Sequence, residues 1–177
     1  PETMLGDTAV AVHPDDERYK DIVGQKCILP IMNKEIPIIA DSFVEKEFGT
    51  GCVKITPAHD MNDYQAGIRN NLEIVEVFDD SSIMLDLVPE YKGMKAIEAR
   101  KLIVEELEKI GALVKTEDYT HNVGKCYRCH STIEPRISEQ WFVKMKDLAK
   151  VAADSVRNDE VKFVPKRYEK MYFNWLD

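Results

Sequence analysis

One short stretch of the sequence gathers most of the side chains that could take part in chemistry. Residues 49–64 read GTGCVKITPAHDMNDY and hold a lysine, two threonines, a histidine and two aspartates. Three kinds of site use such groups: a metal site, a phosphate-binding loop, and a polar pocket for a small charged substrate. The elements that carry these side chains help to distinguish the three.

The local pattern predicts a strand over residues 51–57 and a short helix over residues 60–70. Because side chains alternate along a strand, Cys52, Lys54 and Thr56 share one face. Asp60 and Asp63 are three residues apart, so they lie on one side of the first helical turn, near the positive end of the helix dipole. A purely structural role also explains them, with Asp60 capping the helix by accepting from the amide of Asp63. The pattern alone leaves both interpretations open.

A metal site and a phosphate loop fit this stretch less well than a substrate pocket. His59, Asp60 and Asp63 are suitable ligand types, but the other histidines have no metal-binding spacing relative to them. Residues 49–51 do not belong to a G-x-x-x-x-G-K-[ST] sequence, and they precede a strand instead of a helix. In a pocket of mixed charge, a carboxylate suits an ammonium group, while a lysine and a hydroxyl suit the oxygens of an ester or a sugar.

The sequence CYRCH at residues 126–130 spaces Cys126 and Cys129 as C-x-x-C. Two thiolates with this spacing form half of a structural zinc site, which normally has four ligands. Cys27 and Cys52 stand alone in predicted strands, and four cysteines in a chain of this length do not form a disulfide framework. Three possibilities stay open: His130 completes a site, residues outside the chain complete it, or no metal binds.

The composition is typical of a globular protein with one sizeable core. The chain has 177 residues, of which 44% are hydrophobic and 32% are charged. No apolar run approaches the roughly 20 residues that span a bilayer, and the first residues lack the regions of a signal peptide. We therefore expect a soluble cytoplasmic protein, a monomer with no membrane partner.

The net charge of −8 argues at first against a nucleic-acid partner, because phosphate contacts usually need a basic face. The average hides an asymmetry. Residues 1–120 carry 13 basic and 24 acidic side chains, whereas residues 121–177 carry 11 and 8. The basic last third is compatible with a nucleic-acid contact, but so small an excess is also typical of an ordinary solvated surface.

The elements around the polar stretch predict a strand-rich domain with covering helices. Residues 94–110 form the clearest predicted helix, with Gly111 at its end, and a second helix is predicted over residues 141–156. The apolar residues near one face of the first helix are Ile97, Leu102, Ile103, Leu107 and Ile110. Strands are predicted at residues 8–12, 26–32, 35–40, 51–57, 74–78 and 112–116. Both ends of the chain lie in structured segments, so we expect a piece of a longer polypeptide.

Several segments together resemble one family. They read PET, GDTAVAVHP, EFGTGCVKITPAHDMNDY, EDYTHNVGKCYRC, QWFVKM and KFVPKRYEKMYFNWL, and the resemblance to the editing insertion of valyl-tRNA synthetases covers essentially the whole chain. It implies an α+β fold in two parts. Residues 1–135 would form a β-barrel-like editing domain with peripheral helices, and residues 136–177 a helical C-terminal extension that returns toward a catalytic domain outside this chain.

The resemblance also implies an activity, the hydrolysis of threonine wrongly esterified to tRNA(Val). By position, Asp63 matches the aspartate that holds the α-ammonium group, and Lys54 is expected to act with it in the chemistry. The family motif T-T-R-P-E-T is represented here only from its proline onward. The other positions implied to contact the substrate are Thr56, Asp60, Phe48, Thr3 and Glu2, with Phe48 near the terminal adenosine.

The resemblance further implies partners and a mechanism. The partners are the acceptor end of tRNA(Val) carrying threonine and the remainder of the synthetase chain. Water would attack the ester with no covalent intermediate and no cofactor, and a zinc ion at Cys126 and Cys129 would be structural, completed by a cysteine pair upstream of the chain. Two alternatives remain: a non-catalytic module that docks the tRNA acceptor end, and a metal-dependent phosphohydrolase built on His59 and Asp60.

Overall fold

A computed structural model describes residues 1–118, 120 and 122–176. Tyr119 and His121, which belong to one of the segments quoted above, and Asp177 lie outside the described residues. The chain forms two compact units, Pro1–Ile137 and Ser138–Asp177. The polar stretch lies in the first unit.

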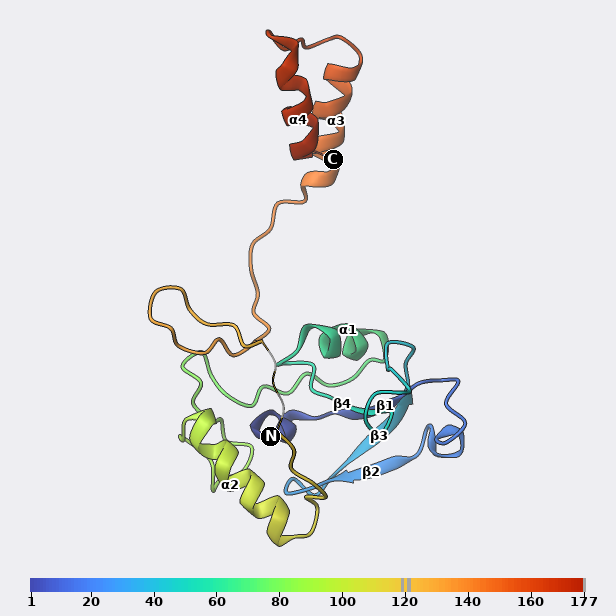
Figure 1. Ribbon diagram of the computed structural model, residues 1–177, viewed down its shortest axis with the longest axis vertical. Helices are drawn as coiled ribbons and strands as arrows, with labels where there is room; N and C mark the ends of the chain where they lie inside the picture. The colour runs from blue at the N-terminus through green and yellow to red at the C-terminus, as the bar shows by residue number, and fades with distance from the viewer. Residues whose placement is uncertain (119, 121, 177) are drawn as a thin grey trace. The chain divides into compact units, whose positions relative to one another are not determined.

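The first unit contains a mixed sheet of four strands (Figure 1). The strands are β1 (Ala9–Val12), β2 (Lys26–Leu29), β3 (Lys34–Ala40) and β4 (Cys52–Ile55), in the order β2-β3-β1-β4. β1 runs parallel to β3 and antiparallel to β4, and β2 is antiparallel to β3. The α+β prediction is confirmed. Among the described residues β2 and β4 are the two edges of an open sheet, so the barrel-like architecture is not confirmed.

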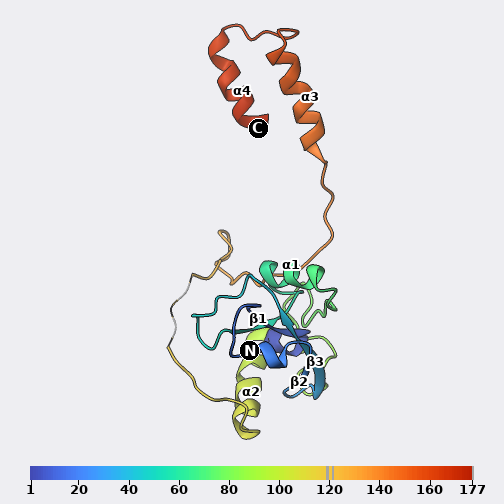
Figure 2. The ribbon, with the colours of Figure 1, turned by 90° about the vertical axis from the view of Figure 1, so that its right-hand side faces the viewer.

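Helix α1 (Met61–Arg69) follows β4 and lies along the sheet in both views (Figures 1 and 2). Its alanine at position 66 is fully buried against β1 and β4, since small side chains let a helix approach a sheet closely. The buried residues of this cluster are Ala9, Ala11, Val44, Ile55 and Ala66. This packing fixes the start of α1 beside the end of β4.

Helix α2 (Ala96–Lys109) confirms the predicted helix but not its predicted buried face. Ile103 and Leu107 are buried, as expected, whereas the other three apolar residues of the predicted stripe are 40–54% exposed: Ile97, Leu102 and Ile110. Ala96 and Ala99 take their places, because they lie three and four residues apart from the next buried positions on the same helical face. Alanine is only weakly hydrophobic, so Ala96 and Ala99 did not indicate the buried face in the sequence.

Two predicted strands are not formed, because neither finds a partner strand. Residues 74–78 make one isolated bridge, between Phe78 and Met84, and residues 112–116 are irregular. Phe78 and Val77 are nevertheless fully buried in the core cluster beneath α2. Their hydrophobicity therefore reports burial and not strand pairing.

The N-terminal segment, which carries Glu2 and Thr3, forms a 3₁₀ helix, η1 (Glu2–Gly6). Glu2 is buried, and its carboxylate forms two hydrogen bonds with the guanidinium of Arg100 on α2, at 2.7 and 2.6 Å. This ion pair ties η1 to α2.

The second unit is a pair of helices with a short 3₁₀ turn. Helix α3 (Met145–Arg157) starts four residues later than predicted, and α4 (Glu169–Leu176) follows η3 (Lys166–Tyr168). The hydroxyl of Tyr172 on α4 donates to the carbonyl of Ala152 on α3 at 2.9 Å. None of the described helices is both long enough and apolar enough to cross a membrane.

Candidate functional site

Lys54 and Thr56 lie side by side at the end of β4, as strand alternation predicted. Lys54 Nζ donates to Thr56 Oγ1 at 2.8 Å. The two residues differ in exposure: the Lys54 side chain is half exposed, whereas Thr56 is fully buried. Ile55 points to the other face and is buried in the core, which fixes the orientation of its two neighbours.

Asp63 joins these two residues from the first turn of α1. Its Oδ2 accepts from the Thr56 amide at 2.9 Å and lies 3.3 Å from Lys54 Nζ. The side chain is buried, so the carboxylate is held between the helix and the strand. Among the described residues, the donors to this carboxylate all bond Oδ2, which leaves Oδ1 to accept from a ligand.

Asp60 is the N-cap of α1, which confirms the structural role that the sequence left open. Its Oδ1 accepts from the amides of Asn62 at 2.8 Å and of Asp63 at 3.0 Å. Asp60 is exposed and lines a cavity of about 830 Å³ next to the start of α2, whereas the Lys54 and Asp63 side chains are not part of that cavity's lining. The two aspartates therefore lie on one helical turn but face different surroundings.

Asp7 is a member of this cluster that sequence reasoning missed. It lies between η1 and β1, is buried, and accepts a hydrogen bond from the Thr56 hydroxyl. Burial raises the pKa of Asp7 to about 6, although the Thr56 hydroxyl and the Lys54 charge oppose that rise. We call Asp7, Lys54, Thr56 and Asp63 the Lys54 network. The one signal in the sequence was an acidic residue directly before a β-prone run, in GDTAVAVHP.

His59 has a structural position that leaves no ring nitrogen for a metal. Its Nε2 accepts from the amide of Val77 at 2.9 Å, and its Nδ1 lies 3.1 Å from the carbonyl of Pro135. Because Nε2 is the acceptor, Nδ1 carries the proton and donates. Burial lowers the pKa of His59, and its ring packs against Phe78 with centroids 4.2 Å apart. This geometry argues against a phosphohydrolase built on His59 and Asp60.

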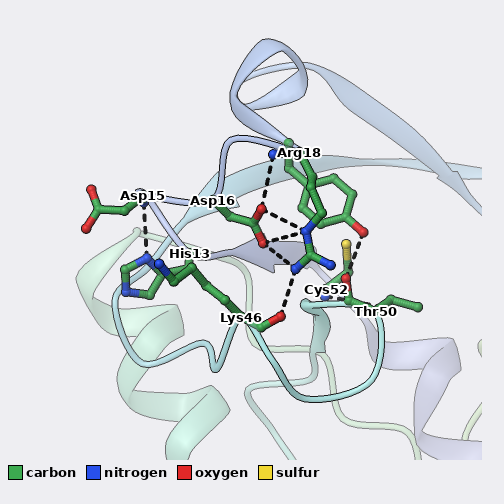
Figure 3. A network of polar contacts seen from close by, with 8 residues as sticks. His13, Asp15, Asp16, Arg18, Lys46, Thr50 and Cys52 are labelled. Carbon is green, nitrogen blue, oxygen red and sulfur yellow. Dashed lines mark hydrogen bonds and ion pairs between the residues drawn. The ribbon is translucent and has the colours of Figure 1, made fainter.

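The turn before β4 is held by an arginine from the segment after β1 (Figure 3). Arg18 Nη2 donates to the Lys46 carbonyl at 2.7 Å, and the guanidinium forms further hydrogen bonds with Asp16. A Cβ at Gly51, whose φ is +76°, would lie 2.5 Å from Arg18 Nη2. The glycine therefore permits close approach by the protein's own arginine.

Phe48 lies in this turn and is 67% exposed. The Phe48 carbonyl accepts from the Gly51 amide at 2.9 Å, and the Tyr19 hydroxyl donates to the Thr50 carbonyl at 2.7 Å. An exposed aromatic ring on a turn that is held by several hydrogen bonds can stack on a nucleobase. Phe48 is therefore presented to solvent, unlike Glu2, which is buried, and Thr3, which is partly buried.

Cys126 and Cys129 lie together in a tight turn. The His130 amide donates to the Cys126 carbonyl, and the Cys126 amide donates to the Ser131 carbonyl, both at 2.9 Å. Hydrogen bonds from Ser131 and from Cys126 lower the pKa of Cys129 to about 7. Two thiols in such a turn fit half of a tetrahedral zinc site. Within the described part of the chain, no group of three or more potential ligands is close enough to hold a metal.

Comparison with known proteins gives the family. Residues 7–108 match the family model described as "Leucyl-tRNA synthetase, editing domain". The chain is 58% identical to the valine-tRNA ligase of Carboxydothermus hydrogenoformans, and 56% identical to those of Thermotoga maritima and Clostridium tetani. These matches cover 99–100% of the chain but only 20% of each relative, so the chain spans about a fifth of their length. The chain therefore belongs to the editing-domain family of the aminoacyl-tRNA synthetases, in the form found in valine-tRNA ligases.

Proposed function

We propose that this chain hydrolyses the ester bond of threonyl-tRNA(Val) as the editing domain of a valine-tRNA ligase. The observation that carries the proposal is the position of Asp63: its buried carboxylate lies between Thr56 and the partly exposed Lys54. A carboxylate with a free acceptor oxygen suits the α-ammonium group of an aminoacyl ester. The family match supports the same function, because the matching segment is an editing domain.

Threonine is a substrate that such a ligase needs to remove. Threonine and valine are nearly isosteric, and valyl-tRNA synthetase is itself the standard example of this problem, with only about 100-fold discrimination in its synthetic site. A second site can accept the threonine hydroxyl and disfavour valine. Valine would leave a polar group of the pocket unpaired, which costs roughly 1–3 kcal/mol.

Each side chain of the site has its own role in substrate binding or in ester hydrolysis. Asp63 Oδ1 binds the α-ammonium group, and the Lys54 ammonium stabilises the oxyanion that forms when water attacks the ester carbonyl. Thr56 positions Lys54 by accepting a hydrogen bond from its ammonium group. Phe48 stacks on the terminal adenosine, and the tRNA acceptor end and the remainder of the ligase chain are the partners. A zinc ion at Cys126 and Cys129 would be structural.

The test is threonyl-tRNA(Val) deacylation by the full-length ligase that carries this segment. Asp63→Ala should slow deacylation by at least 100-fold, because it removes the ammonium acceptor and a contact of Lys54. Asp60→Ala is the matched control on the same turn, and it should cost only about 1 kcal/mol of stability through the lost cap. Unchanged deacylation by Asp63→Ala would contradict the assignment of Asp63.

A docking role without catalysis gives a different result in the same assay. The wild-type ligase would then bind tRNA with a strong dependence on salt but leave the ester intact.

A further inference from the structure

Asp7 determines which groups donate and which accept hydrogen bonds in the Lys54 network. A hydroxyl group has one hydrogen and two lone pairs. The Thr56 hydrogen is directed to the Asp7 carboxylate, so Thr56 Oγ1 serves as the acceptor for Lys54 Nζ at 2.8 Å. Lys54 therefore donates to Thr56, and Thr56 donates to Asp7. The buried Asp7 carboxylate, which can only accept when ionised, fixes the direction of both hydrogen bonds.

Asp7 also decides the net charge of the network. Lys54 contributes one positive charge, and Asp7 and Asp63 contribute one negative charge each, so the three groups carry one surplus negative charge when all are ionised. An aminoacyl ester has an ammonium group and no carboxylate, so it brings one positive charge. Because unbalanced charge in a buried site is costly, the ester is the ligand that neutralises the network. Without the charge of Asp7, Lys54 and Asp63 already balance each other.

We propose that Asp7 is a positioning residue of the editing site, whose charge draws the α-ammonium group of an aminoacyl ester into the Lys54 network and whose oxygen orients Thr56. This inference rests on the proposed function. Asp7 does not touch the substrate, because its side chain is 3% exposed and lies behind the fully buried Thr56. It acts through Thr56, Lys54 and the shared charge balance.

The groups around Asp7 predict how the site responds to pH. Asp7 faces Lys54 from β4 and Asp63 from α1. Burial raises the pKa of Asp7 to about 6, so the surplus negative charge exists above this pH and disappears below it. Binding of a cationic ester should therefore weaken as the pH falls through 6.

The burial of Asp7 also lowers the free energy of unfolding when its carboxylate is ionised. The pKa of Asp7 in the folded chain lies above its ordinary value of 3.8, so the stability that its protonated form contributes is complete below pH 3.8 and is lost as the pH rises through about 6. Asp7→Asn keeps the size and removes the charge. It should therefore raise the thermal midpoint at pH 7.5 while it weakens editing, whereas a residue with only a structural role would change both in one direction.

The experiment measures deacylation of threonyl-tRNA(Val) by the full-length ligase between pH 5 and 8. At pH 7.5, Asp7→Asn should raise KM about tenfold, with kcat within about twofold, and its KM should show no step near pH 6. A second substrate is tRNA(Val) esterified with the α-hydroxy analogue of threonine, which lacks the ammonium group. Wild type and Asp7→Asn should hydrolyse this neutral ester with the same KM.

Asp41→Asn is the matched control, because Asp41 is another buried carboxylate, paired with Arg69 on α1 at 3.0 Å. It should lower the thermal midpoint and keep the wild-type pH profile. An unchanged KM and pH step in Asp7→Asn would overturn the inference. So would a lower thermal midpoint with equal losses on both substrates, which indicates a structural role. No deacylation by the wild type would instead overturn the proposed function, and this inference with it.

Discussion

The Lys54 network and the cysteine turn at residues 126–130 are built in opposite ways. The network joins residues from the segment before β1, the end of β4 and the first turn of α1, and three of its four members are buried. The cysteine turn is made of neighbours in sequence, with hydrogen bonds that reach only five residues along the chain. Cys129 and His130 are exposed. Tertiary packing therefore builds the first site, and local backbone geometry builds the second.

The largest effect is expected from an ion pair of the N-terminal segment, in which the carboxylate of Glu2 is buried and the Arg100 side chain is partly exposed. Glu2 precedes Asp7 in the same segment, and although burial alone would raise its pKa, hydrogen bonds from Arg100 lower the pKa to about 2. A lowered carboxylate pKa contributes stability above pH 4.5 that is lost as the pH falls toward 2. Glu2→Gln should cost about 3 kcal/mol at pH 7 and almost nothing at pH 2, measured by urea unfolding.

The pH dependence distinguishes Glu2 from Asp7, since the two pKa values move in opposite directions. As the pH falls, wild-type stability should rise through Asp7 between about pH 6 and 3.8 and fall through Glu2 between pH 4.5 and about 2. An equal cost of Glu2→Gln at pH 7 and pH 2 would mean that the ion pair with Arg100 does not stabilise the fold.

The next effect compares two buried threonines. Thr56→Val removes the hydroxyl that links Asp7 and Lys54, so it should cost about 2 kcal/mol of stability and slow deacylation at least tenfold. Thr8 is also buried, and its Oγ1 has no hydrogen-bond partner among the described residues. Thr8→Val should therefore be neutral or slightly stabilising by thermal unfolding. Similar costs for the two variants would show that the network contributes no more than side-chain volume.

The smallest effect on folding is expected at the cysteine turn. Ser131 helps to lower the pKa of Cys129 to about 7, whereas burial raises the pKa of Cys27. Iodoacetamide should therefore modify Cys129 at pH 7 about tenfold faster than Cys27, as followed by peptide mass spectrometry. Ser131→Ala should slow the modification of Cys129 and change the unfolding free energy by less than about 0.5 kcal/mol. Equal rates at the two cysteines would contradict the lowered pKa.

Local patterns predicted the elements and part of the site. Strand alternation predicted that Lys54 and Thr56 share a face, and the hydrogen bond between them confirms it. The capping pattern predicted the start of α1 and offered the cap as one of two roles for Asp60, and the structure shows the cap. These features could be predicted because alternation, helical spacing and capping depend on residues within a few positions of one another.

The predictions that failed depended on packing between distant segments. The strand expected at residues 74–78 lacks a partner strand, and the buried face of α2 is completed by Ala96 and Ala99. A strand exists only where another strand pairs with it, and an alanine is buried only where a neighbour approaches closely. Neither condition can be read from one segment alone.

The sequence by itself determined the strand that carries Lys54 and Thr56, the capped helix that carries Asp63, and the cysteine turn, since each depends on near neighbours. Only the tertiary structure decided that Asp63 and not Asp60 meets Lys54, and that Asp7 completes the network. Antiparallel pairing of β1 with β4 sets Ala9 opposite Ile55, and this brings Asp7 to Thr56 across 49 positions. The physical reason is that a carboxylate removed from water needs a donor, and only the fold supplies one from so far along the chain.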